Sequence, residues 1–151
     1  EISECLVGSE MCIRDRKFPS FIERRRHNWE RLHKELECIQ DRIILPEPAE
    51  NSRPSWFGFL ISVRPETGIE RNKITRYIEE HNVQTRLLFS GNIIKHPCFD
   101  QIRDTDAYRV SGDLSVTEFV MNNTFWVGVY PGMTDVMIDY MAEVIKDAVN
   151  L

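Results

Sequence analysis

No stretch of this 151-residue chain approaches the roughly 20 consecutive apolar residues that a membrane-spanning helix needs. The first residues also lack the basic-then-apolar pattern of a secretory signal peptide. The formal net charge of −5 argues against nucleic acid or an anionic membrane surface as the main partner. We therefore expect a cytoplasmic protein that binds neither nucleic acid nor membrane.

The four cysteines are widely spaced and contain no C-x-x-C pair, so the sequence supports neither a disulfide framework nor a zinc site. A glycine-rich phosphate-binding motif is missing as well. No Ser/His/Asp arrangement, metal cluster or pair of carboxylates in a shared apolar setting marks a complete catalytic site. The residues alone indicate an α+β domain with a polar, ligand-facing loop, or part of a larger enzyme.

Hydrophobic residues make up 42% of the chain and charged residues 28%, which is typical of one globular domain with its own core. The chain does not begin with Met, and we expect it to be part of a longer protein. Residues 1–16 show neither helical nor alternating periodicity. They resemble a translated sequencing adapter, so we expect a non-native or disordered leader there, the alternative being an ordinary frayed terminus.

Apolar residues recur at three- and four-residue steps from Lys17 to about Gln40, which predicts a long amphipathic helix. Such a helix can connect two lobes or simply pack against a core. Its predicted apolar stripe is Phe18, Phe21, Ile22, Trp29, Leu32, Leu36 and Ile39. Further helices are predicted at 72–81 with Asn72 as N-cap, at 115–122, and from an N-cap at Thr134. The buried stripe predicted for the last helix is Met137, Met141, Val144, Ile145 and Ala148.

Three strands are predicted, at 56–63, 83–89 and 124–130, giving an α+β unit whose small, mostly antiparallel sheet carries helices on one face. The first run is almost continuously apolar, so we expect both of its faces to be covered or nearly so. Gly58 within it suggests a bulge or the close approach of another backbone. Trp126 and Tyr130 are interpreted as core or interface residues. The core-facing side of the second strand is predicted to be Val83, Thr85, Leu87 and Phe89.

The segment Gln84–Phe99 is the candidate binding loop, because a strand breaks there at Ser-Gly-Asn among polar donors. Arg86 at the strand end can bind a phosphate or carboxylate with two donors, or form a surface ion pair. Asn92 can bind a sugar hydroxyl or phosphate, or only occupy the turn. His96 can hydrogen-bond a ligand or transfer a proton, or simply lie on the surface.

Three segments occur in one order: PSWFGFLISV at 54–63, QTRLLFSGNIIKHPCF at 84–99 and NNTFWVGVYPGMTDVMIDYM at 122–141. Together they resemble the C-terminal part of the DegT/DnrJ/EryC1/StrS family of nucleotide-sugar enzymes, which use pyridoxal phosphate (PLP). Within it they are most similar to the 3-dehydrases of lipopolysaccharide sugar synthesis, the CDP-4-keto-6-deoxy-D-glucose type. The resemblance covers about Lys17 to Leu151.

The resemblance implies a two-lobed, fold type I enzyme with residues 17–42 as the inter-lobe helix and 43–151 as the small C-terminal domain, its sheet three-stranded. It implies PLP or its amine form PMP as cofactor, held mainly by the other lobe, where histidine replaces the Schiff-base lysine of the aminotransferases. In the CDP-sugar branch it adds a [2Fe-2S] cluster on cysteines outside this chain. A homodimer is implied, and a reductase partner is compatible with this branch.

The function that follows from the resemblance is removal of the C3 hydroxyl of a CDP-4-keto-6-deoxyhexose in O-antigen synthesis. Arg86, Phe89, Asn92 and His96 would belong to the small-lobe loop that closes over the sugar nucleotide. None of the four histidines has the context of the family's catalytic histidine, so the chain alone is expected to be inactive. The alternatives are a sugar aminotransferase of the same family and a non-catalytic α+β binding module.

Overall fold

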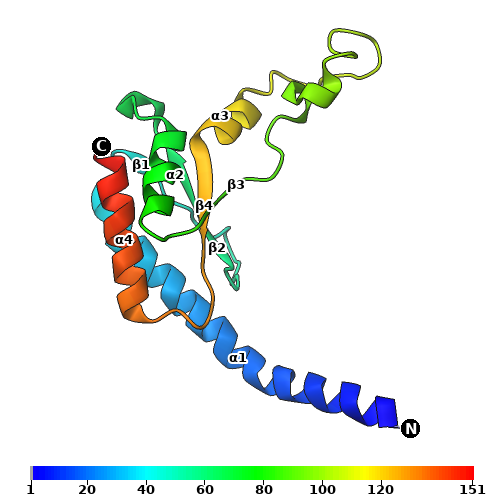
Figure 1. The fold of residues 1–151 in the computed structure, drawn as a ribbon, viewed down its shortest axis with the longest axis vertical. Helices are drawn as coiled ribbons and strands as arrows, with labels where there is room; N and C mark the ends of the chain where they lie inside the picture. Colours follow the sequence, from blue (N-terminus) through cyan, green and yellow to red (C-terminus); the bar gives the residue numbers. More distant parts are fainter. Residues whose placement is uncertain (1) are drawn as a thin grey trace.

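The computed structural model describes residues 2–151, with side chains described from Asp15 onward. Its four-stranded sheet has the order β1-β2-β4-β3, and every neighbouring pair is antiparallel. The strands are β1 Ile43–Ile44, β2 Gly58–Val63, β3 Thr85–Leu87 and β4 Thr124–Gly128. The helices are α1 Ile2–Leu36, α2 Arg71–Glu80, α3 Ser115–Asn123 and α4 Asp135–Val149. Figure 1 shows α1, α2 and α4 along one side of the sheet, with α3 leading into β4.

The α+β class, the antiparallel sheet and the placement of the helices are confirmed, but the predicted number of strands is wrong. The extra strand, β1, contains only two residues, which pair with the end of β2 as Ile43↔Val63 and Ile44↔Ser62. Two residues are too few to show an alternating pattern, so this strand exists through its pairing with β2 rather than through a local signal.

The core lies between the sheet and the helices. Alternate residues of β2 and β4 point into it, and Phe59, Ile61, Phe125 and Val127 are completely buried. Burying each such side chain stabilises the fold by about 1.5–3 kcal/mol. On the opposite face, the residues Leu60 and Trp126 are only half-buried. The expectation that both faces of β2 are covered is therefore met on one face and only partly on the other.

Helix α1 begins at Ile2 and runs without a break through Pro19, so it does not begin at Lys17. Trp29, Leu32 and Leu36 are buried as predicted, whereas Phe18 and Phe21 are exposed. Figure 1 shows the reason: the N-terminal half of α1 projects away from the body of the molecule. Glu1 lies outside the described residues, and the origin of residues 1–16 stays a prediction. None of the described helices is both long and apolar enough to cross a membrane.

The ends of the other helices follow local signals in most cases. Thr134 caps α4, and its Oγ1 accepts a hydrogen bond from the Met137 N–H at 3.3 Å. Asn82, directly after α2, has a φ of 62°, a left-handed conformation that asparagine tolerates at a helix end. The predicted cap at Asn72 is wrong, because α2 begins at Arg71 and Glu70 occupies the N-cap position.

The buried stripe of α4 is shifted at its N-terminal end. Met141, Val144, Ile145 and Ala148 are buried as predicted, but Met137 is 44% exposed and Ile138 is fully buried in its place. Both residues lie at the edge of the apolar stripe, so their spacing in the sequence does not decide which one is buried.

This shift can be tested with neighbouring substitutions. Ile138→Ala is expected to lower the free energy of unfolding by about 2–5 kcal/mol, because it leaves a cavity in the core. Met137→Ala, the matched control one residue earlier, is expected to cost less than about 1 kcal/mol. Urea unfolding followed by circular dichroism measures both, and equal losses would contradict the described register of α4.

Candidate functional site

A cleft of about 770 Å³ opens between β4, the turn that follows it, α4 and the connection from α2 to β3. Its walls are mostly apolar and aromatic: Trp126, Gly128, Tyr130, Met133, Val136, Met137, Tyr140 and Met141, together with Val83. Its polar lining side chains besides the tyrosines are Asn82, Gln84 and Arg86. Such a combination of apolar walls and a few polar groups is typical of a small-molecule site.

Trp126 reaches the outer face of the sheet because its neighbours Phe125 and Val127 take the inner face. Its indole Nε1 donates a hydrogen bond to the Leu87 carbonyl at 3.3 Å, which fixes the ring beside β3. Across the sheet, a Cβ at Gly58 would lie 2.7 Å from Trp126 Cε3. The close approach expected at Gly58 is thus real, but it is made by a side chain rather than by another backbone.

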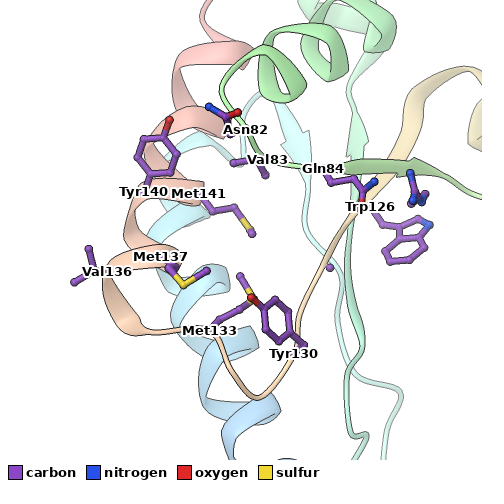
Figure 2. Close-up of a pocket in the computed structure, with 12 residues that line it drawn as sticks. Asn82, Val83, Gln84, Trp126, Tyr130, Met133, Val136, Met137, Tyr140 and Met141 are labelled. Atoms are coloured by element: carbon purple, nitrogen blue, oxygen red, sulfur yellow. The ribbon is translucent and has the colours of Figure 1, made fainter.

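Three methionines at four-residue spacing line the cleft: Met133 in the turn before α4, and Met137 and Met141 on α4 itself. Figure 2 shows Met137 and Met141 directed from α4 toward the strands, with Trp126 at the far end. Tyr140 donates its hydroxyl to the His81 carbonyl at 3.0 Å and so ties α4 to the end of α2. Unbranched thioether side chains adapt to a ligand's shape, so this wall can accommodate flat or irregular groups.

The turn after β4 forms another wall, and α1 holds it in place. Asn28 Nδ2 donates to the Tyr130 carbonyl at 2.9 Å, and Arg24 Nη2 donates to the Met133 carbonyl at 2.9 Å. Arg24 Nη2 also pairs with Asp135 Oδ1 at 2.8 Å. The long helix therefore positions Tyr130 and Met133 directly.

Charged pairs complete the contact between α1 and α4. His27 Nε2 donates to Asp135 Oδ1 at 3.1 Å, and the hydrogen bonds from His27 and Arg24 lower the pKa of Asp135. Arg31 makes a two-pronged contact with Asp139 at 2.7 and 2.9 Å, which lowers the pKa of that carboxyl. Both carboxylates are thereby held in the charged form, and Asp135 lies in the first turn of α4, where the helix dipole favours negative charge.

Among the residues that the structure describes, Arg86 is the one charged residue that lines the cleft. With the Gln84 amide turned so that its oxygen faces the guanidinium, Arg86 Nη1 and Nη2 lie 3.1 and 2.9 Å from that oxygen. The surface ion pair considered as an alternative is not found among the described side chains. The guanidinium therefore presents positive charge at the cleft, where a phosphate or carboxylate can be bound.

Phe89 lies outside the core, contrary to the predicted core-facing pattern. Strand β3 ends at Leu87, whose side chain is exposed although it too was predicted to face the core. Phe89 is also exposed, and its φ of 46° is not that of a strand residue. Phe89 instead lines a second, apolar hollow of about 160 Å³, beside Trp126. Trp126 thus separates two hollows, with Arg86 on one side and Phe89 on the other.

Asn92 and His96 are involved in the fold of the loop itself. Asn92 is only 3% exposed, and its backbone N–H points at Met121 Sδ at 3.3 Å. His96 Nε2 donates to the Ser90 carbonyl at 2.6 Å. The structure therefore brings Arg86 and Phe89 to the two sides of Trp126, and places Asn92 and His96 in a separate, internally bonded turn.

Sequence reasoning missed the aromatic and methionine walls of the cleft. Trp126 and Tyr130 were interpreted as core or interface residues, and Met137 as part of a buried stripe. The available signals were the alternation in TFWVG, which sends Trp126 to the face opposite Phe125, and the four-residue spacing of the methionines. Neither signal reveals which other elements of the fold face these side chains across the cleft.

Comparison with known proteins gives a consistent set of relatives. A model described as the DegT/DnrJ/EryC1/StrS aminotransferase family matches residues 11–146. The chain is 44% identical over 133 residues to dTDP-4-dehydro-2,6-dideoxy-D-glucose 3-dehydratase of Saccharopolyspora spinosa, covering 88% of this chain and 28% of that protein. It is 38% identical over 131 residues to the lipopolysaccharide biosynthesis protein RfbH of Salmonella typhimurium, covering 87% and 29%.

A solved structure shows the same fold. Escherichia coli GDP-4-keto-6-deoxy-D-mannose-3-dehydratase with bound hydrated PLP matches with a TM-score of 0.71 at 25% identity, covering 86% of this chain and 32% of that one. The chain therefore spans less than a third of the length of these relatives.

The position of Trp126 can be tested through two glycines that face each other across the sheet, Gly58 and Gly128. Gly58→Ala is expected to displace the indole and cost about 1–3 kcal/mol of stability. Gly128→Ala is the matched control, because its added Cβ meets no atom within 4 Å. Tryptophan fluorescence should change in the Gly58 variant alone. If Gly58→Ala still changes the tryptophan fluorescence in a Trp126→Phe background, the signal does not come from Trp126, and this would contradict the contact between Gly58 and the Trp126 indole.

The ion pairs of Asp135 predict a dependence of stability on pH. Because its pKa is lowered in the folded state, the stabilisation is present above the unfolded-state pKa of about 3.9 and is lost as the pH falls through the folded-state value. Asp135→Asn is expected to be less stable at neutral pH and to show a shallower loss of stability below about pH 5. Urea unfolding from neutral to acidic pH measures this, with Asp147→Asn on the same helix as control. Parallel curves for the Asp135 variant and wild type would refute it.

Proposed function

Because the chain belongs to the DegT/DnrJ/EryC1/StrS aminotransferase family, we propose that it is the C-terminal lobe of a nucleotide-hexose 3-dehydrase that uses PLP or PMP. In this proposal residues 17–42 form the inter-lobe helix and residues 43–151 the small domain. The substrate is a CDP-4-keto-6-deoxyhexose of O-antigen synthesis, which loses its C3 hydroxyl. The names of the two curated relatives, a nucleotide-sugar 3-dehydratase and a lipopolysaccharide biosynthesis protein, support this reaction class.

The observation that carries the proposal is an arginine, Arg86, that has no carboxylate partner among the described side chains and lies beside an aromatic wall. A nucleotide sugar offers a diphosphate and flat or ring-shaped groups. The Arg86 guanidinium can donate two parallel hydrogen bonds to phosphate oxygens. Trp126, its register partner on β4, and Tyr130 offer ring faces and a hydroxyl within the same cleft. These are the recognition groups that such a ligand requires.

Phe89, Asn92 and His96 enter the proposal as the rest of the substrate-side wall. Phe89 extends the apolar surface beyond Trp126. The hydrogen bond from His96 to Ser90 closes the turn that follows Phe89, and the buried Asn92 forms its base. In this conformation the direct contacts to substrate come from Arg86 and Phe89, and the other two residues maintain the loop.

The cleft does not fit PLP by itself. The described residues that line it include no lysine or histidine, and Arg86 is the one charged group among them. Within the described residues no group of three or more potential metal ligands occurs, and Cys38 and Cys98 are separate, exposed thiols. We therefore assign no step of the reaction to a cofactor held by these residues. The proposal places the cofactor, and a [2Fe-2S] cluster if the enzyme is of the CDP-sugar type, on protein outside this chain.

The same proposal includes a homodimer, a reductase partner for the CDP-sugar type and a cytoplasmic location. Free thiols such as Cys38 and Cys98 are compatible with a reducing compartment.

A sugar aminotransferase is the second candidate, because the matching family model carries that description. The two candidates differ in product: a dehydrase yields a sugar that has lost its C3 hydroxyl, and an aminotransferase yields an amino sugar. Replacing the matching part of the S. spinosa relative with residues 17–151, and measuring the product mass, tests whether this lobe supports dehydration. An active chimera that forms only amino sugar would favour the second candidate.

The binding site can be tested on the chain itself. Titration of the ¹⁵N-labelled chain with CDP is expected to shift the resonances of Arg86 and of the Trp126 indole, because the diphosphate binds the guanidinium. Arg86→Ala is expected to weaken binding by about 10- to 100-fold, the scale of a charged hydrogen bond. Arg76→Ala, an exposed arginine on α2, is the matched control.

Cytidine without phosphates is expected to bind more weakly than CDP. Equal shifts with both ligands, or equal binding by wild type and the Arg86 variant, would overturn the assignment of Arg86 to a phosphate.

A further inference from the structure

The candidate loop is packed against one side chain of α3. Gly91 has a φ of 61°, and a Cβ at this position would lie 2.5 Å from Met121 Cγ. The next residue, Asn92, directs its backbone N–H at Met121 Sδ, 3.3 Å away. Met121 therefore touches two consecutive residues at the point where the loop reverses direction. No larger residue than glycine fits there without moving Met121.

Met121 is itself held from the other side. Its carbonyl lies in the last turn of α3 and accepts a hydrogen bond from Arg71 Nη2 at 3.3 Å. Arg71 is 9% exposed, and burial lowers its pKa. Carbonyls at a helix C-terminus lack intrahelical partners and carry partial negative charge, so a buried guanidinium at this position stabilises the helix end.

A second contact joins the same helix face to the loop. Lys95 Nζ pairs with the Glu118 carboxylate, one turn before Met121. Helix α3 continues directly into β4, where the hydroxyls of Thr124 and Ser62 lie 2.8 Å apart. The loop is therefore fastened to a helix that is anchored at its C-terminal end to both α2 and the sheet.

We propose that Met121 is a positioning residue for the candidate site: held by Arg71, it fixes the Gly91–Lys95 turn and, through it, the placement of Phe89 beside Trp126. The consequence for substrate rests on the function proposed above, whereas the ordering of the loop does not. Met121 is not among the described residues that line the cleft, so its proposed effect on binding is transmitted through the loop.

The test is hydrogen exchange of the 151-residue chain, read residue by residue. Met121→Ala is expected to speed exchange about tenfold at the two hydrogen-bonded amides of this turn, those of Asn92 and Lys95, a change on the scale of one hydrogen bond. Amides of the core, such as those of Ile78 and Ile145, are expected to exchange as in wild type. Val116→Ala, at an exposed position of the same helix, is the control and should change neither region.

A conservative variant separates positioning from simple packing. Met121→Leu keeps most of the volume against Gly91 but removes the sulfur acceptor. Exchange at the Lys95 amide should return toward the wild-type rate, while the Asn92 amide stays fast. Unchanged exchange in Met121→Ala, or faster exchange spread equally over Ile78 and Ile145, would overturn the proposal.

Titration with CDP separates this proposal from the proposed function. If wild type binds CDP, Met121→Ala is expected to weaken binding severalfold without a change at Arg86, and unaltered binding would contradict positioning of the site. If wild type does not bind CDP, the proposed function fails, and the exchange rates alone decide whether Met121 orders the loop.

Discussion

The register of β4 is the constraint on which the rest of the structure depends. This strand is hydrogen-bonded to β2 on one side and to β3 on the other. Phe125 and Val127 must therefore face the helices, because a shift of one residue would bring them to solvent and carry Trp126 into the core. The same register sets Trp126 opposite Arg86, so hydrophobic packing on one face of the sheet determines where the recognition groups lie on the other face.

The elements that could be predicted from the sequence are those with local physical causes. Thr134 caps α4 through its own hydroxyl, and Asn82 ends α2 because asparagine tolerates a left-handed backbone. Strand β1 has no such signal, since its two residues are ordered by pairing with β2. The difference between Met137 and Ile138 also depends on tertiary contact, because both fit the helical stripe and only the packing of α4 decides which one is buried.

The candidate site was predictable in part for the same reason. Arg86 could be proposed because a cation at the end of a strand is visible in the sequence, and the structure places it in the lining of the cleft. The role of Asn92 was not visible, because its backbone N–H points at the side chain of Met121, which lies 29 positions further along the chain. Polar residues in a Gly-Asn turn can donate to a ligand or to the fold, and only the three-dimensional neighbours distinguish these two uses.

Helix α1 connects the cleft to any movement of the chain's N-terminal part. Arg24 and Asn28 hold the carbonyls of Met133 and Tyr130, and charged pairs to Asp135 fix α4 beside them. A rotation of α1 about its own axis would therefore draw the Tyr130–Met133 wall with it, because these contacts are short and share one helix face. If α1 joins two lobes, as proposed, the angle between the lobes and the shape of the cleft are mechanically linked. The contacts between α1 and α4 are then part of the candidate site, although none of the side chains that make them lines the cleft.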